Sequence, residues 1–107
     1  MDSKNYQFTS KANEDLDEIL NYFSNELSSP MAAKNFFVHI FESLDRLCLF
    51  PESCPLVDNE FIKRKDIRKS VIDNYILYYI YDKENSLIIF LRIVYGRRDI
   101  NKILKSI

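Results

Sequence analysis

The stretch Leu87–Leu104, LIIFLRIVYGRRDINKIL, decides the fold. It opens as an almost unbroken apolar run, which is typical of a strand covered on both faces. Arg92 interrupts this run, and the run ends at Gly96, the only glycine of the chain. We expect Gly96 to supply backbone freedom where the strand leaves the sheet, with Arg97 and Arg98 displayed at its end. An interior strand with an arginine, followed at once by two more, needs an explanation.

Length and composition are those of a soluble protein with one domain. The 107 residues are enough for one hydrophobic core and too few for two, so we expect residues 1–107 to form a single domain. No apolar run approaches the ~18 residues that a membrane span needs. The N-terminus MDSKNYQF also lacks the pattern of a secretory signal. We therefore expect a cytoplasmic protein without membrane contact.

The cysteines and the single histidine give no sign of a metal or cofactor site. Cys48 and Cys54 lie in CLFPESC without a second pair or a histidine nearby, and this spacing disfavours metal binding. We expect both thiols to be reduced, with Cys48 contributing to helix packing. His39 has no acid, cysteine or second histidine near it in the sequence, so we interpret it as a surface residue. No cofactor is expected.

Charge is divided unevenly along the chain, although the formal net charge is only −1. Residues 1–60 carry four Lys and Arg against eleven Asp and Glu, a net charge of −7. Residues 61–107 carry eleven against five, a net charge of +6. This asymmetry favours a basic surface that meets an acidic partner, while solvated surface charge is the alternative explanation.

Two amphipathic helices follow a short strand in the first half of the chain. Thr9 or Ser10 can cap the first helix, whose early acids, at positions 14, 15, 17 and 18, suit the positive end of the helix dipole. Ser29 is a good cap for the second helix, and Pro30 fits its first position. So short a link predicts an antiparallel hairpin. The predicted elements are a strand at residues 6–9, a helix ending near Leu27, and a helix over residues 30–50 with the apolar stripe Ala33, Phe37, Ile40, Leu44 and Leu47.

Three strands rich in β-branched and aromatic residues fill the second half. Turn residues separate them, so they are predicted to form an antiparallel meander. We interpret Tyr75, Tyr78 and Tyr79 as structural aromatics without a chemical role. The strands span Asp66–Ile72, Tyr75–Tyr81 and Leu87–Tyr95, and residues 99–107 can add a short helix. The order β-α-α-β-β-β(-α) predicts an α+β fold, in which a helical hairpin packs on one face of a small antiparallel sheet.

Side chains alternate between the two faces of a strand, and this alternation gives the last strand one face without charge. That face, which we expect to lie against the helices, holds Leu87, Ile89, Leu91, Ile93 and Tyr95. Arg92 then projects from the opposite face with Phe90 and Val94, where we predict a docking groove for another chain. The alternative is that Arg92 pairs with a neighbouring carboxylate such as Asp99.

The GRRD turn after this strand has a structural and a binding interpretation. Asp99 is expected to cap the final helix. Two adjacent arginines cannot both pair with it, so at least one of Arg97 and Arg98 is left for an anionic partner.

Four short motifs follow one another along nearly the whole chain. They are SP-x-A-A at 29–33, L-x-x-FP at 47–51, NY-hydrophobic-x-Y at 74–78 and RI-x-x-GRRD at 92–99. In this order they resemble the RelE/ParE toxin superfamily of bacterial type II toxin–antitoxin systems. The fold that this resemblance implies, a helical hairpin against a small antiparallel sheet, agrees with the predicted order of elements.

The resemblance also implies two kinds of target. RelE-like members cleave messenger RNA on the ribosome, whereas ParE-like members inhibit DNA gyrase without ribonuclease activity. Ribonuclease members place an arginine where this chain has Ile76, and a tyrosine where it has Leu104, six residues after Arg98. Of that basic set Arg98 and Lys69 remain. Hydrocarbon side chains supply neither the proton transfer nor the charge stabilisation that RNA cleavage needs.

We therefore favour a ParE-like toxin that inhibits gyrase, is not an enzyme, and is neutralised by a cognate antitoxin in a toxin–antitoxin hetero-oligomer. Two alternatives stay open: a ribosome-dependent mRNA endoribonuclease, and a degenerate member that only binds its antitoxin. The candidate residues for binding the target or the antitoxin are Arg92, Arg97, Arg98, Phe90, Arg68 and Lys69.

Overall fold

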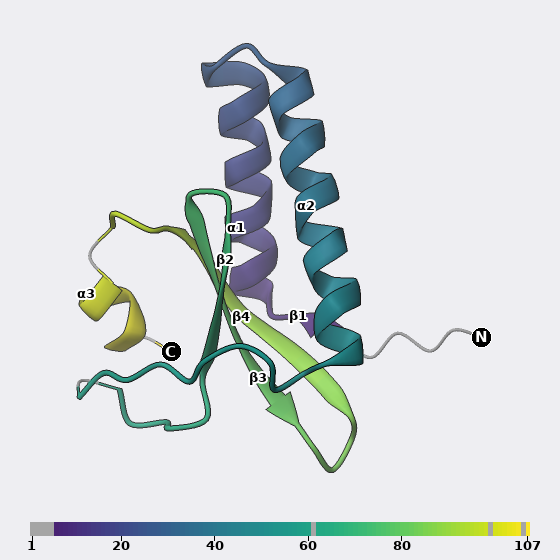
Figure 1. Ribbon diagram of the computed structural model, residues 1–107. Helices are drawn as coiled ribbons and strands as arrows, with labels where there is room; N and C mark the ends of the chain where they lie inside the picture. The colour runs from purple at the N-terminus through teal and green to yellow at the C-terminus, as the bar shows by residue number, and fades with distance from the viewer. Residues whose placement is uncertain (1–5, 61, 99, 106) are drawn as a thin grey trace.

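The computed structural model of the protein describes residues 6–60, 62–98, 100–105 and 107. Its elements follow the predicted order, and the α+β fold class is confirmed (Figure 1). They are β1 (Tyr6–Phe8), α1 (Ser10–Asn21), η1 (Tyr22–Glu26), α2 (Pro30–Leu49), β2 (Arg68–Ile72), β3 (Tyr75–Asp82), β4 (Leu87–Tyr95) and α3 (Ile100–Lys105).

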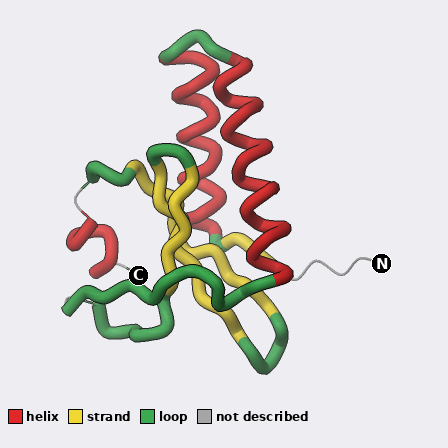
Figure 2. Tube along the Cα trace, in the orientation of Figure 1, coloured by secondary structure: helices red, strands yellow, loops and turns green. Residues whose placement is uncertain are grey.

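The sheet is covered on both faces. Its strand order is β1-β4-β3-β2. β2, β3 and β4 form the predicted antiparallel meander, and β1 adds a parallel strand beside β4. α1 and α2 lie on one side of the sheet, and α3 lies on the other with the loop that joins α2 to β2 (Figures 1 and 2). The near-continuous apolar sequence of β4 suits this position, because most of its side chains on both faces are buried or partly buried and only Tyr95 at its end is exposed.

Capping residues fix the helical hairpin as predicted. The Thr9 side chain accepts a hydrogen bond from the Ala12 N–H at 3.1 Å, and the Ser29 hydroxyl accepts one from the Ala32 N–H at 3.2 Å. Pro30 occupies the start of α2. The first helix widens into a π-helix, η1, before it ends close to the predicted residue. The tip of the hairpin extends beyond the sheet (Figure 1).

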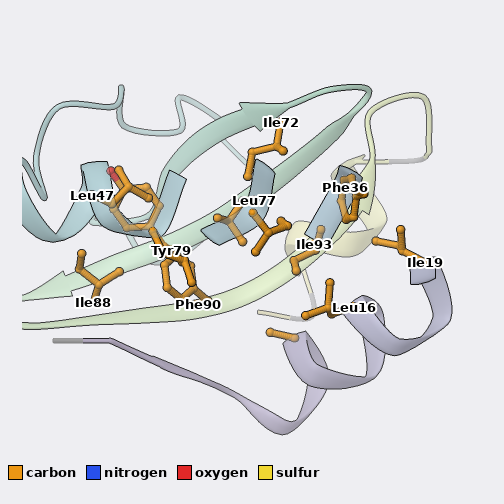
Figure 3. Close-up of a cluster of buried hydrophobic side chains, with 13 residues drawn as sticks. Leu16, Ile19, Phe36, Leu47, Ile72, Leu77, Tyr79, Ile88, Phe90 and Ile93 are labelled. Carbon is orange, nitrogen blue, oxygen red and sulfur yellow. The ribbon is translucent and has the colours of Figure 1, made fainter. Parts of the chain in front are cut away.

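The main core lies between the hairpin and the sheet (Figure 3). The predicted stripe of α2 is correct except at Phe37, which is 44% exposed, whereas Phe36 is 2% exposed. Both positions lie about one turn before Ile40, and only the packing of α2 on the sheet decides between them. The sheet residues of this core include Leu77 and Tyr79 of β3 and Ile88, Phe90 and Ile93 of β4.

A second cluster of buried side chains lies on the opposite face of the sheet. Its members are Ile62, Ile67, Tyr78, Ile80, Val94, Ile103 and Leu104. The last two belong to α3, so this short helix closes the face that the hairpin leaves uncovered. In the part of the chain that the structure describes, no helix has the length and apolar character to cross a bilayer.

Candidate functional site

β4 contains a bulge near the point where β1 ends. Tyr78 of β3 pairs with Arg92 and Tyr79 pairs with Phe90, so Leu91 is an extra residue without a partner in β3. One extra residue reverses the alternation of side chains between the two faces. Even-numbered residues before the bulge and odd-numbered residues after it therefore face the hairpin.

Arg92, the first residue after the bulge, pairs with Asp15 of α1. Arg92 Nε donates to Asp15 Oδ2 at 2.7 Å and Nη2 donates to Oδ1 at 3.1 Å. The same carboxylate accepts a hydrogen bond from the Ile93 N–H at 2.9 Å. Both side chains are buried. Because β1 ends at Phe8, opposite Phe90, Asp15 takes the place that a strand partner would occupy further along β4.

The predicted docking face around Arg92 is therefore wrong. Phe90 is 0% exposed and packs on the hairpin side, whereas Val94 packs on the α3 side. Arg92 does pair with a carboxylate, as the alternative predicts, but the partner is Asp15, 77 residues away in sequence. Asp99 lies outside the described residues. Neither Arg92 nor Phe90 offers a surface to a partner in this structure.

The prediction that odd-numbered residues of the last strand face the helices is right only beyond the bulge. Ile93 packs in the hairpin-side core, but Ile89 and Leu91 pack against the α3-side cluster. The sequence also assigns Asp15 to the helix dipole, and here the carboxylate serves the sheet instead.

Arg97 and Arg98 lie exposed beyond the end of β4, as the sequence predicts. Among residues 6–60, 62–98, 100–105 and 107, neither guanidinium has an ion pair. The Gly96 N–H donates to the Asn74 carbonyl at 2.9 Å, and the Arg98 N–H donates to the Tyr95 carbonyl at 3.0 Å. Gly96 does not have a positive φ, so the predicted backbone freedom is not what the turn uses. A Cβ there would lie 3.3 Å from the Asn74 oxygen, and this close approach favours glycine.

The two arginines line two different cavities. Arg98 lines a cavity of about 520 Å³ between the hairpin and the ends of β3 and β4. Arg97 lines a cavity of about 330 Å³ that it shares with Asp73 and Val71 of the β2–β3 hairpin. Tyr75 and Tyr95 line both. The end of β4 therefore presents one cation to each of two hollows.

Of the basic pair in β2, Lys69 is exposed and Arg68 is engaged in the fold. The Arg68 guanidinium donates to the carbonyls of Glu52 and Cys54 at 3.2 and 2.7 Å, and it lies 3.5 Å from the Glu52 carboxylate. Arg68 thereby holds the α2–β2 loop on the sheet. Its predicted binding role would require these bonds to break.

The fold brings an acid to His39, which has none near it in the sequence. His39 Nδ1 lies 2.9 Å from Asp73 Oδ2, and the pair joins α2 to the β2–β3 turn. Both side chains are nearly half exposed, which confirms His39 as a surface residue. The hydrogen bond to Asp73 raises the pKa of His39 above its usual 6.5. Asp73 also lines the cavity of Arg97.

The tyrosines of β3 behave as packing residues. Tyr78 and Tyr79 are buried, and the Tyr79 hydroxyl donates to the Pro51 carbonyl at 3.0 Å. The Tyr75 ring lies 5.0 Å from the Phe36 ring. Burial raises the pKa of all three tyrosines above the usual 10, which makes deprotonation of their hydroxyls still less favourable.

Cys48 and Cys54 are not joined in a disulfide, and both pack, partly buried, against the hairpin-side core. Their placement agrees with the packing role predicted for Cys48. Among the described residues, His, Cys, Asp and Glu do not gather in groups of three or more that could hold a metal ion.

The residues that sequence reasoning overlooked are Asp15 and the hairpin side chains of the larger cavity. One signal for Asp15 was present. It lies on the same helix face as Ala12, Leu16 and Ile19, and an acid within an apolar stripe is rarely buried unless it is paired. The cavity left no such signal, because the hairpin and the strand ends that form it are far apart in sequence.

One family pattern covers nearly the whole of this fold. The family described as "ParE toxin of type II toxin-antitoxin system, parDE" matches residues 6–100. The chain belongs to this ParE toxin family. It is thus a toxin of the RelE/ParE superfamily, as its four motifs predict.

Two solved structures share the fold of this ParE family member. One is described as "Chromosomal ParDE TA system from P. aeruginosa", with a TM-score of 0.66, 19% sequence identity, and coverage of 85% of this chain and 94% of that chain. The other is the toxin–antitoxin complex RelBE2 from Mycobacterium tuberculosis, with a TM-score of 0.58, 20% identity, and coverage of 86% and 96%. No match is found among curated protein sequences. At these identities the likeness shows the fold alone, and it is shared by a ParE-type and a RelE-type system.

The structure also places Ile76 and Leu104, the two hydrocarbon side chains that the sequence comparison with ribonuclease members singled out. Leu104 of α3 is 2% exposed and packs in the cluster that contains Tyr78 and Val94. Ile76 of β3 is partly buried and lies beneath Gly96, with side-chain atoms 3.8 Å from where a Cβ would stand. Both residues are therefore part of the packing around the strand end.

Proposed function

We propose that this toxin arrests DNA gyrase, acts without enzymatic chemistry in the cytoplasm, and is neutralised by a cognate antitoxin. The observation that carries the proposal is the burial of Leu104 in the α3-side cluster. By resemblance, ribonuclease members have a tyrosine at this position and an arginine at that of Ile76. In this chain Leu104 is a packing residue of the fold, and Ile76 is partly buried at the strand end.

The chemistry available at the strand end supports a binding role. Cleavage of RNA through its 2′-hydroxyl needs a group that transfers a proton and a cation that stabilises the anionic transition state. Tyr22, Tyr75 and Tyr95 supply the hydroxyl groups that line the cavities of Arg97 and Arg98. Burial raises the pKa of Tyr75, which disfavours it as a base at neutral pH. Arg97 and Arg98 are exposed cations, and these suit contact with an anionic surface.

The antitoxin part of the proposal is supported by the family and by the similar solved structures, which are toxin–antitoxin complexes. Exposed cations at the end of β4 and at Lys69 suit acidic side chains of such a partner. We also assign Arg97 and Arg98 to the contact with the target, so the antitoxin and the target use the same cations.

Controlled expression without antitoxin tests the target. Supercoiling of a reporter plasmid, the DNA-damage response and mRNA integrity are followed together in the same culture. We expect early loss of negative supercoiling and induction of the damage response while mRNA stays intact. Early codon-specific mRNA cleavage with normal supercoiling contradicts the proposal. Soluble, folded protein without any growth effect favours the degenerate member that only binds its antitoxin.

A charge-matched pair of variants tests the assigned residues. Arg97→Glu with Arg98→Glu should abolish growth arrest, because both contacts with an anionic surface become repulsive. Lys34→Glu with Lys63→Glu changes the net charge equally at exposed positions that line neither cavity and should leave the arrest intact. Equal toxicity of the two double variants would remove Arg97 and Arg98 from the target contact.

One observation favours the ribonuclease alternative. His39 is hydrogen-bonded to Asp73, and Asp73 lines the same cavity as Arg97. A histidine that is hydrogen-bonded to a carboxylate can act as a general acid or base, and here that carboxylate lines the same cavity as the Arg97 cation. His39→Ala separates the two functions, since it should abolish a ribonuclease but leave gyrase arrest unchanged.

A further inference from the structure

The larger cavity at the end of β4 has an aromatic lining. Its volume of about 520 Å³ is within the range of ligand-sized clefts, roughly 300–1,000 Å³. Four rings line it: Tyr22 and Phe23 from η1, Tyr75 from β3 and Tyr95 from β4. Tyr22 lies 5.9 Å from Phe23, Phe23 lies 6.2 Å from Tyr75, and Tyr75 lies 5.6 Å from Tyr95, measured between ring centroids. The rings therefore form a continuous row from the hairpin to the sheet.

The two ends of this row are exposed. Tyr22 is 46% exposed and Tyr95 is 38% exposed, whereas Phe23 and Tyr75 between them are partly buried. Tyr22 lies in the π-helical segment, a kind of irregularity that is frequent at functional sites. Aromatic side chains that offer one apolar side to a cleft are typical anchors for large apolar groups of a partner.

The charges in the cavity select the kind of partner. Asp15 lines the cavity, but its carboxylate is paired with Arg92 and with the Ile93 N–H. Glu18 of α1 then contributes one negative charge from the hairpin side, and Arg98 contributes one positive charge from the sheet side. A polyanion such as single-stranded nucleic acid would meet Glu18 along with Arg98. A peptide with a large apolar side chain between a basic and an acidic residue complements both charges.

We propose that this cavity is the docking site for such a segment of the antitoxin. A large apolar or aromatic side chain of the segment lies on the row of rings, an acidic residue pairs with Arg98, and a basic residue pairs with Glu18. The inference rests on the proposed function, since it assumes an antitoxin. It adds a means of neutralisation, because the antitoxin then covers Arg98, which the proposed function assigns to the target.

A fluorescent reporter tests whether the antitoxin enters the cavity. The chain contains no tryptophan, so Tyr22→Trp places a single indole at the rim of the cavity. Phe37→Trp is the matched control, because Phe37 on α2 is 44% exposed and does not line the cavity. Each variant is titrated with the purified cognate antitoxin, after any tryptophan in that antitoxin is replaced by phenylalanine. We expect a blue shift and protection from acrylamide quenching for Tyr22→Trp alone.

Binding constants test the anchors. Tyr22→Ala and Arg98→Glu should each weaken the complex about tenfold or more, as for residues at the centre of an interface. Phe37→Ala should leave the dissociation constant unchanged. Since Tyr22 is nearly half exposed, its truncation is not expected to unfold the protein, and circular dichroism of the free variants checks this.

The outcomes separate the inference from the function on which it rests. Antitoxin that binds every variant as tightly as the original chain, without a signal from Tyr22→Trp, overturns the docking site and leaves the toxin–antitoxin function intact. A failure of the antitoxin to bind the original chain overturns both. If an oligothymidine probe shifts the emission of Tyr22→Trp and the antitoxin does not, the cavity binds nucleic acid, and the proposal of a peptide partner is overturned.

Discussion

Among single residues, Asp15 and Arg92 set the course of β4. One buried carboxylate accepts two guanidinium N–H groups and the Ile93 N–H. A buried ion pair gains little over apolar packing, but losing one partner is costly because the other charge stays buried and unpaired. The pair lies directly beside the bulge, and the bulge decides which side chains of β4 face the hairpin.

Removing the Arg92 side chain should lower the stability of the fold, because Arg92 is buried and paired with Asp15. Arg92→Ala is expected to lower the free energy of unfolding by about 3–5 kcal/mol, because Asp15 loses its buried counter-ion. Urea denaturation measures this difference. Lys11→Ala, which removes an exposed pair with Glu14 at 3.8 Å, should cost less than about 0.5 kcal/mol. Equal denaturation midpoints for the two variants would show that the buried pair contributes nothing.

His39 gives the protein a pH-dependent contact. Its pKa is raised by Asp73, so the stabilisation from the pair is fully present below the usual 6.5 and is lost as the pH rises through the higher folded value. As the chain has one histidine, its ring protons can be titrated by NMR without overlap. Asp73→Asn should bring the pKa of His39 back toward 6.5. An unchanged titration curve contradicts the pairing.

At the scale of elements, α3 closes the core on the face of the sheet opposite the helical hairpin. Leu104→Tyr installs the side chain that ribonuclease members have by resemblance, but the position is 2% exposed. Overpacking of this kind should cost about 1–3 kcal/mol of stability, whereas the volume-conserving Leu104→Met should cost less than about 1.5 kcal/mol. Thermal denaturation compares the two. Ribonuclease activity in a stable Leu104→Tyr variant would instead support the enzymatic alternative.

The elements themselves could be predicted because their signals are local. Thr9, Ser29 and Pro30 mark the helix starts, and periodicity marks the lengths. The bulge could not be predicted, because LIIFLRIVY is apolar on both faces and a shift by one residue leaves its pattern almost unchanged. The partner of Arg92 could not be predicted either, because Asp15 lies 77 residues away in sequence and only the folded chain brings the two together.

The sequence predicts the exposed cations of the candidate site, but it does not predict which residues lie around them. Arg97 and Arg98 follow a strand that the sequence defines clearly, so their exposure at its end could be expected. Arg68 also belongs to an adjacent pair of basic residues, but the carbonyls of the α2–β2 loop accept hydrogen bonds from its guanidinium. No local pattern distinguishes these cases, because loop placement depends on contacts with the sheet.

For the whole molecule, the uneven charge is partly compensated within the fold. The acidic first 60 residues and the basic remainder are joined by ion pairs of Asp15 with Arg92, and of Glu52 with Arg68 and Lys83. Those cations serve the fold. Arg97 and Arg98 have no such pair among the described residues, and they account for the basic end that we assign to the target.

The most direct test of this assignment uses purified components. The toxin is added in rising amounts to DNA gyrase, ATP and relaxed plasmid, and supercoiling is followed on agarose gels. We predict that the original chain inhibits supercoiling, that the double variant Arg97→Glu with Arg98→Glu does not, and that His39→Ala inhibits as well as the original. Full supercoiling in the presence of excess folded toxin, with mRNA cleaved on purified ribosomes by the same preparation, would contradict the account.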